Sequence, residues 1–389
     1  MEVAIDPRTT RRCRDILVIF LTTRLGLFLI AWLASYLLPS GAALQPGNLH
    51  YAQDAPNALS AWAQWDAHWY LLIADHGYAA LQENPSLAPD NHPQDTSGFF
   101  PLYPGMVRLA SYLTGPLGGS LTAALLVSNL ALLGFLCLLA TWTAERYGEE
   151  AARGACVALC MFPTSLFLSA PYSESLFLLL ALAALMACRR DRHLLVFTLA
   201  AAAALTRPVG VLLILPLAWS AFDRRSPGRI RALRGASALG APAGLLAFAG
   251  FCQWQFGDAT AFLARQERWR GAIGPPWTFL TEYLQQPRAH GGSGSTVDLA
   301  VALLALAVLP AVFRRLGVGL GLYATAVLLI PLSSGLFSFS RLVLAAFPLF
   351  LMAGIWWAEK PNLRLAYPAV ALPLAGLFTA LYTTGWWVG

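Results

Sequence analysis

ILVIFLTTRLGLFLIAWLASYLL, residues 16–38, is an apolar run interrupted by a single charged residue, Arg24. A helix needs about 20 consecutive apolar residues to cross the hydrocarbon core of a bilayer, so this stretch predicts a transmembrane helix. The chain is 57% hydrophobic and only 12% charged, and its mean hydropathy is +0.58. Soluble domains carry about 25% charged residues. The sequence therefore predicts an all-α polytopic membrane protein. Further apolar runs lie at about 120–142, 235–256, 299–313, 318–334, 342–357 and 365–387.

The formal net charge of +6 does not indicate a nucleic-acid partner. The excess consists of arginine in short loops, and Lys360 is the only lysine, so no polybasic arm exists. Six cysteines lie in or beside apolar segments without the spacing of metal ligands, which speaks against a zinc site or a structural disulfide.

Arginine clusters between the apolar runs predict the topology, because positively charged loops face the cytoplasm. Residues 39–118 hold one arginine, Arg108, and residues 257–297 form the second long polar stretch. We expect both to be extracytoplasmic loops of one domain spanning 1–389, in a cell-membrane protein with a cytoplasmic N-terminus. The count is then about eleven transmembrane helices.

Two intervals between cytoplasmic arginines, 154–188 and 194–222, are too short for two full crossings each. Their natural breaks are Ser169–Glu174 and Thr206-Arg207-Pro208. Broken helices inside a membrane are tolerated where they line a protein or water cavity. We therefore expect Tyr172, Glu174 and Arg207 to face an extracytoplasmic recess.

The first outer loop carries an acid among tryptophans. Residues 61–75 are expected to form a helix with Trp62, Trp65, Asp66 and Trp69 on one face. The alternative is an interfacial anchor helix whose Asp66 faces bulk water. Against it, a carboxylate beside apolar surface is costly unless it is paired or used. A second in-plane helix is expected at 99–113, with Arg108 placed to reach a phosphate.

Several further charges are candidates for binding an anion. Arg265, Arg268 and Arg270 lie in the second outer loop against the usual charge bias, which suggests a phosphate partner, with lipid headgroups as the alternative. Arg341 opens a predicted span, and Arg24 lies within one; intramembrane arginines are functional candidates, and Glu174 is the expected partner for one of them. No metal site is expected, although the loop residues Asp90, His92 and Asp95 form an alternative ligand set.

An extracytoplasmic pocket with one acid, several arginines and many aromatic rings fits a glycosyltransferase that uses a polyprenyl-phosphate sugar. Asp66 would be the general base for the acceptor hydroxyl. The residues expected to bind the donor phosphate are Arg207, Arg341, Arg270 and Arg108. The residues expected to contact the substrates are Trp62, Trp65, His68, Trp69, Tyr70, Tyr103, Tyr172, Glu174, Asp258, Gln266 and Trp269.

Two motifs resemble the first luminal loop of the PIG-V family, GPI mannosyltransferase 2. They are WDAHWYLLIADHGY at 65–78 and FFPLYP at 99–104. Weaker matches follow in the same order and extend the resemblance over roughly residues 60–350. They are PTS at 163–165, APYSESLF at 170–177, RPVG at 207–210, FGD at 256–258 with Gln266 and Trp269, and Ser340-Arg341 with Phe347-Pro348.

The resemblance implies a GT-C fold and inverting transfer of mannose from polyprenyl-phosphate mannose, with no obligatory metal or other cofactor. It places the family's luminal-loop aspartate at Asp66. The alanine-, leucine- and arginine-rich composition is typical of high-GC bacteria, which in general make no GPI. The acceptor is therefore expected to be another glycolipid or glycan, and nothing in the sequence indicates a partner subunit.

Two alternatives remain open at this stage. One is a GT-C transferase that moves another sugar, such as arabinose, glucose or an aminosugar. The other is a transporter or flippase for a lipid-linked sugar. A transporter favours inverted repeats and ionisable residues at mid-membrane, whereas this chain shows no internal repeat and gathers its polar clusters at one face.

Overall fold

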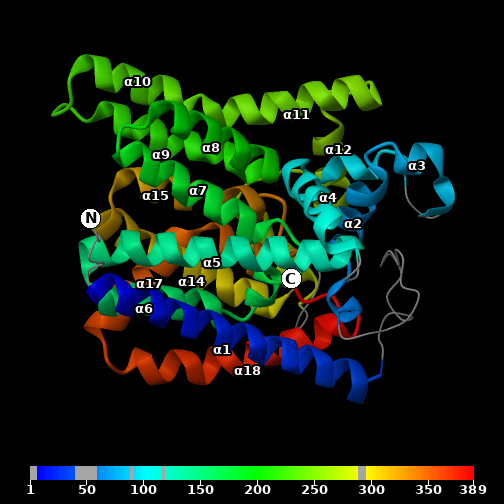
Figure 1. Cartoon of the computed structure of the whole chain (residues 1–389), viewed down its shortest axis with the longest axis horizontal. Helices are drawn as coiled ribbons and strands as arrows, with labels where there is room; N and C mark the ends of the chain where they lie inside the picture. The colour runs from blue at the N-terminus through cyan, green and yellow to red at the C-terminus, as the bar shows by residue number, and fades with distance from the viewer. Residues whose placement is uncertain (1–6, 40–58, 88–91, 116–118, 288–294) are drawn as a thin grey trace.

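In the computed structural model the described residues are 7–39, 59–87, 92–115, 119–287 and 295–389, and they form helices and no β-strand. The long helices lie side by side along the longest axis of the molecule (Figure 1). They include α1 (Pro7–Leu37), α5 (Gly119–Tyr147), α11 (Gly240–Phe256) and α18 (Leu363–Thr383). The prediction of an all-α fold is confirmed.

Five helices of the described part are long and apolar enough to cross a membrane: 9–37, 119–147, 228–256, 296–316 and 363–383. A bent pair of helices raises this number to six. Each of the eleven predicted spans coincides with a helical segment, but the shorter segments do not meet this criterion alone. The protein is a multi-pass membrane protein, and the number of eleven crossings stays a prediction.

Both predicted hairpins are broken. The second break lies where the sequence indicated, whereas the first, predicted at 169–174, already begins after Cys160. The first comprises α6 (Glu149–Cys160), η6 (Ser165–Leu168) and α7 (Glu174–Arg189). The second comprises α8 (His193–Thr206), η7 (Pro208–Leu213), α9 (Ile214–Trp219) and η8 (Ser220–Phe222). Arg207 is extended, with φ −152° and ψ 145°, because the ring of a following proline disfavours helical backbone at the preceding residue.

The last third of the chain differs from the single span predicted at 342–357. Here α16 (Phe339–Leu342) and η9 (Val343–Ala345) meet α17 (Phe347–Glu359) at an angle of 80°. Pro348, in the first turn of α17, suits a helix start. The same region contains α14 (Thr296–Leu316) and α15 (Val318–Leu332), whereas α10 (Gly228–Ala238) precedes α11.

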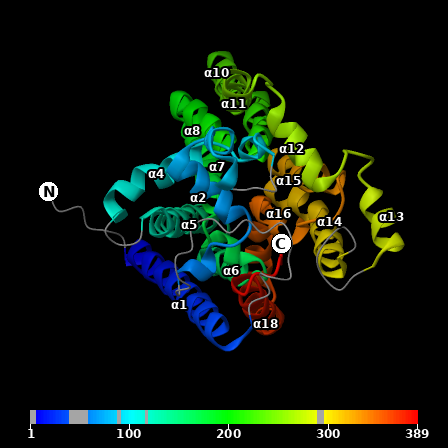
Figure 2. The same cartoon turned by 90° about the vertical axis from the view of Figure 1, so that its right-hand side faces the viewer.

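The two outer stretches gather at one end of the bundle, at the right of Figure 1 and facing the viewer in Figure 2. The second helix predicted in this stretch, at 99–113, is present as α4 (Leu102–Thr114) and lies at this end in Figure 2, while its in-plane orientation stays a prediction. The other elements there are η2 (Ser60–Trp62), α2 (Asp66–His76), α3 (Ala80–Glu83), η3 (Pro85–Leu87), η4 (Asp95–Gly98), α12 (Ala261–Arg270) and α13 (Thr278–Gln285).

Candidate active site

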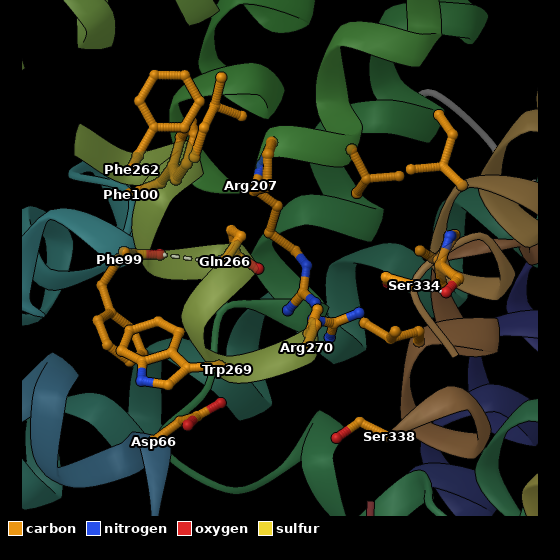
Figure 3. Close-up of a pocket in the computed structure, with 18 of the residues that line it drawn as sticks. Asp66, Phe99, Phe100, Arg207, Phe262, Gln266, Trp269, Arg270, Ser334 and Ser338 are labelled. Atoms are coloured by element: carbon orange, nitrogen blue, oxygen red, sulfur yellow. Dashed lines mark hydrogen bonds between the residues drawn. The ribbon is translucent and has the colours of Figure 1, made fainter. Parts of the chain in front are cut away.

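One cavity of about 1020 Å³ opens among α2, α12, η7 and α16. Figure 3 shows the side chains that converge on it. A volume of this size accommodates a large organic ligand. Its polar lining includes Asp66, Arg207, Gln266, Arg270 and Arg341, and its apolar lining includes Val209, Leu212, Leu245, Ile330 and Leu342.

Asp66 is the first residue of α2, and its carboxylate lines the cavity with 34% of the side chain exposed. The preceding Trp65 has φ 57° and ψ −122°, a backbone that non-glycine residues seldom adopt. The helix therefore begins at Asp66, and the predicted start at Ala61 is wrong, with Trp62 in the separate turn η2. A carboxylate in the first turn is stabilised by the helix dipole. The anchor-helix alternative assumed that Asp66 faces bulk water. The structure instead places the Asp66 carboxylate in the lining of the cavity.

Arg341, from α16, links the two carboxylates of the site. Its Nη1 donates to Asp66 Oδ2 at 2.6 Å, and its Nε donates to Glu174 Oε1 at 2.6 Å. The guanidinium lies over the ring of Tyr172, 4.5 Å from the centroid, and only 7% of the side chain is exposed. Glu174 is thus the arginine partner that the sequence predicted, and it also serves a second arginine.

That second arginine is Arg207, at the break between α8 and η7. Its Nη1 lies 2.6 Å from Glu174 Oε1 and donates to Ser173 Oγ at 3.2 Å. The same Ser173 Oγ is 2.8 Å from the hydroxyl of Tyr70 on α2. The charged residues at the two predicted hairpin breaks, Glu174 and Arg207, therefore lie in contact with each other.

Arg270, the last residue of α12, is half-buried and lines the cavity. Among the described residues its side chain makes neither a hydrogen bond nor an ion pair. Removal from water, together with the nearby charges of Arg341 and Arg207, lowers the pKa of its guanidinium to about 10. Figure 3 shows the heads of Arg207 and Arg270 directed toward the same part of the cavity.

The charges of this cluster do not balance. In the ion-paired cluster and beside it, three guanidiniums, Arg207, Arg270 and Arg341, face two carboxylates, Asp66 and Glu174. A third carboxylate, the exposed Glu267, also lines the cavity but forms no ion pair with these arginines. One positive charge is left over in a partly desolvated place, where an unpaired charge is costly. The cluster is therefore suited to a ligand that carries negative charge.

The other arginines of α12 have a different partner from the one expected. Asp95 of η4 is buried, and its Oδ1 accepts from Arg265 Nη1 at 3.1 Å and from Arg268 Nη1 at 3.3 Å. Its Oδ2 accepts from the backbone N–H of His92. These ion pairs fix α12 against η4, so Arg265 and Arg268 serve structure. Asp90 lies outside the described residues.

Aromatic rings form the wall beside Asp66. Phe99 packs between Trp69, at 5.6 Å between centroids, and Trp269, at 5.4 Å. Gly98 permits this approach, because a Cβ there would meet the Trp269 ring at 2.4 Å. Gln266, one turn earlier in α12, donates from Nε2 to Gly98 O at 3.3 Å. The predicted substrate contacts Trp65, Trp69, Tyr70, Gln266 and Trp269 all line the cavity.

Three predicted aromatic contacts are packed beneath the cavity instead of lining it. Trp62, Tyr103 and Tyr172 are fully buried. The Tyr103 hydroxyl is 2.8 Å from Ser128 Oγ, and the Tyr172 hydroxyl donates to Gln64 O at 3.0 Å. They support the cavity walls from behind.

Four polar residues of the predicted site also lie outside the lining. His68 is a fully buried residue of α2 that does not line the cavity, and Glu174 acts through the two arginines it binds. Asp258 accepts from the N–H and hydroxyl of Thr260 at the start of α12. Arg108 is exposed on α4 and does not line the cavity.

Two residues near the site escaped the sequence reasoning. Trp387 lines the cavity, and its ring centroid lies 5.4 Å from that of Trp65. It looked like the end of a span, and the positive φ of Gly385 turns the chain back toward the site. Asp298 is buried close to α16. The spacing Ser295-x-x-Asp298 is an N-terminal helix signal, and an acid at the start of a span is a candidate by itself.

Comparison with known proteins places this chain in a family. The family model described as mannosyltransferase (PIG-V) matches residues 13–223. GPI alpha-1,6-mannosyltransferase 2 of Cricetulus griseus is 35% identical over 143 residues, which are 34% of this chain and 26% of that protein. The Homo sapiens protein of the same name is 32% identical over 142 residues, with the same two shares. The matched part thus spans about a quarter of the length of these relatives.

The fold has a counterpart among solved structures. ArnT from Cupriavidus metallidurans, bound to undecaprenyl phosphate, aligns with a TM-score of 0.51 at 17% identity, covering 94% of this chain and 68% of that chain. This likeness shows the GT-C fold, and the fold expected from the resemblance is confirmed.

Proposed function

Because the chain belongs to the mannosyltransferase (PIG-V) family, we propose that it transfers mannose from a polyprenyl-phosphate mannose to a hydroxyl group of a glycolipid or glycan acceptor. One observation carries the proposal: Asp66 lines the same cavity as three arginines, and one of these, Arg270, has no ion pair among the described residues. A carboxylate that can accept a proton and a site for a phosphate are the two groups that such a transfer requires.

In the proposed reaction the acceptor oxygen attacks the anomeric carbon of mannose from the face opposite the phosphate. The new bond to carbon forms as the bond from that carbon to the phosphate oxygen breaks, so the configuration inverts. Asp66 takes the proton of the acceptor hydroxyl, and the lipid monophosphate leaves with the bonding electron pair. A positioned general base contributes about 10²–10⁴-fold to such a step.

The arginines stabilise the leaving phosphate, whose negative charge increases in the transition state. Arg207 and Arg341 are held by Glu174, and Arg270 supplies a positive charge that forms no ion pair among the described residues. The phosphate would compete with Asp66 for Arg341 and so release the carboxylate for its role as base. These guanidiniums supply the charge stabilisation without a divalent metal, and no other cofactor is required.

The apolar lining gives the polyprenyl chain a place. Val209 and Leu212 of η7 face the same cavity as Ile330 of α15 and Leu342 of α16. A lipid phosphate is bound in the ArnT structure, whose fold this chain shares. We place the protein in the cell membrane with its N-terminus in the cytoplasm and the cavity on the extracytoplasmic side, since the arginine-rich loops lie at the opposite end.

The test uses the purified chain in liposomes with polyprenyl-phosphate mannose labelled in the sugar and an extract of membrane glycolipids. We expect label to appear in a new glycolipid or glycan, and we expect no transfer from polyprenyl-phosphate glucose or arabinose. Transfer from only one of those donors would replace mannose by another sugar. Movement of the donor between leaflets without any transfer would overturn the proposal in favour of a transporter.

A further inference from the structure

Two buried side chains from different parts of the chain hold the backbone of Ser340, the residue just before Arg341. Asp298 Oδ1 accepts from the Ser340 N–H at 2.6 Å, and Thr164 Oγ1 donates to the Ser340 carbonyl oxygen at 2.6 Å. Asp298 is 1% exposed and Thr164 is fully buried. Neither lines the cavity. The peptide groups on both sides of Ser340 are therefore fixed from outside α16.

The helix that carries Arg341 has few means of fixing its own position. It has four residues, Phe339–Leu342, and the 80° bend to α17 lies a few residues beyond it. Ser338, just before it, is in the left-handed region at φ 64°, which is unfavourable for a residue with a side chain. Isolated helical turns are unstable, so contacts with neighbouring segments must determine where Arg341 lies.

Burying the carboxylate of Asp298 costs free energy unless other groups compensate for the lost water. Asp298 lies in the first turn of α14, where Ser295 Oγ accepts from its backbone N–H. Within the described residues its carboxylate forms no ion pair. A buried carboxylate is tolerated when hydrogen bonds and the positive end of a helix compensate for lost water. Here the compensating donor belongs to Ser340, next to the arginine that holds Asp66.

Thr164 is itself held in place by the buried arginine of the first span. Arg24 donates from Nη2 to Cys160 O at 2.5 Å and from Nη1 to Ser165 O at 2.9 Å. These two carbonyls flank the turn between α6 and η6 that contains Thr164. Arg24 does not line the cavity, so its charge supports the site through this turn.

We infer that Asp298 and Thr164 are positioning residues that set the place of the Arg341 guanidinium between Asp66 and Glu174. The inference rests on the proposed function, because it assumes that Arg341 binds the lipid phosphate. A displacement of about 1 Å in such a group can reduce activity up to about 10²-fold. Loss of either contact is therefore expected to weaken phosphate binding, although neither Asp298 nor Thr164 lines the cavity.

The test measures the affinity of the full chain for undecaprenyl monophosphate in nanodiscs, alongside thermal unfolding. Asp298→Ala and Thr164→Val each remove one contact, and each should weaken binding by about tenfold. The matched variants Asp298→Asn and Thr164→Ser keep an acceptor and a donor, so they should stay within about threefold of the wild-type affinity. Two segments are tested because Asp298→Ala alone could fail to fold.

The discriminating measurement repeats the substitutions in an Arg341→Ala background. If the contacts act through Arg341, then Asp298→Ala and Thr164→Val should change the remaining affinity by less than about twofold there, because coupled residues are not additive. A purely structural role would instead give the same tenfold loss in both backgrounds. That additive result would overturn the inference.

These measurements also distinguish the positioning role of Asp298 and Thr164 from the proposed binding of phosphate by Arg341. Wild-type affinity in Arg341→Ala would overturn the phosphate site and the role of the two residues together. Loss of affinity in Arg341→Ala, with wild-type affinity in both folded Asp298→Ala and Thr164→Val, would overturn the positioning role alone. Rescue by the conservative variants combined with non-additivity supports it.

Discussion

Arg341 and Arg315 both pair with a glutamate, but they do so at different ends of the bundle and with different consequences. The Arg315–Glu359 pair has side-chain exposures of 51% and 41%, whereas the Arg341–Glu174 pair has exposures of 7% and 4%. An exposed pair contributes about 0–1 kcal/mol to the free energy of unfolding. Breaking a buried pair by removing one partner costs about 3–5 kcal/mol.

The balance of charge differs as well. Away from the cavity, Arg12 and Arg315 each pair with one glutamate, and their side chains are 18% and 51% exposed. In the cavity, Glu174 Oε1 serves two arginines while Arg270 has no acid of its own. Arginine alone therefore does not mark a candidate phosphate site. The arginines of the cavity differ from those of the loops predicted to be cytoplasmic in being buried and in having too few ion-pair partners.

The largest effect is expected from Asp66→Asn. Removing the base should lower the transfer rate by about 10²–10⁴-fold. The affinity for undecaprenyl monophosphate should stay equal or increase, since Arg341 loses the carboxylate that competes for it. Initial rates with labelled donor and equilibrium binding check the two parts. Transfer at the wild-type rate would show that the base is another group.

The next effect concerns the buried pair itself. Glu174→Gln leaves Arg207 and Arg341 without their shared carboxylate, so the free energy of unfolding should fall by about 3–5 kcal/mol. Undecaprenyl monophosphate should restore part of the thermal stability, because its charge replaces the missing one. The matched control is Glu359→Gln, which breaks the exposed pair and should cost about 0–1 kcal/mol. Equal losses in the two variants would contradict the comparison.

A smaller effect should follow from Arg270. Burial and the neighbouring arginines lower its pKa to about 10, and a bound phosphate favours the protonated form. Below that pH the guanidinium is charged and affinity is at its maximum. Above it, binding must take up a proton, so Kd should rise by up to about tenfold per pH unit.

Arg270→Gln is the control for this pH profile. It should weaken phosphate binding by about tenfold, the scale of a lost charge-assisted hydrogen bond, and should flatten the rise of Kd between about pH 9 and 11. An unchanged profile in this variant would assign the titration to another group.

The smallest effect is expected from removing divalent ions. The proposed site stabilises the phosphate with guanidinium groups, so excess EDTA should leave the transfer rate within about twofold of the untreated enzyme. Loss of activity in EDTA that magnesium or manganese restores would require a metal in the reaction.

Local patterns were enough to predict much of this site. The aromatic cluster around Asp66 and the breaks at Glu174 and Arg207 pointed to residues that the structure brings together. The errors arose where the backbone departs from its local pattern. The positive φ of Trp65 starts α2 at Asp66, which moved Trp62 out of the expected face.

Distant contacts could not be predicted in this way. From hydropathy, Arg108, Arg265 and Arg270 were all predicted to be outer-loop arginines that could bind an anion. The structure separates them, since Arg265 binds Asp95, Arg108 is exposed, and Arg270 lines the cavity. Which arginine faces the cavity depends on how α12 packs on η4. No pattern among neighbouring residues in the sequence predicts this packing.

By itself the sequence determined that this protein is a bundle of apolar helices with its polar residues gathered in two outer stretches, because hydropathy and helix breaks are properties of neighbouring residues. Only the tertiary structure decided which charges act together. Arg341 meets Asp66 across 275 positions of chain and Glu174 across 167. Such an encounter is set by the packing of whole helices, and in a partly desolvated cavity that packing determines whether an arginine is neutralised or left to bind an anion.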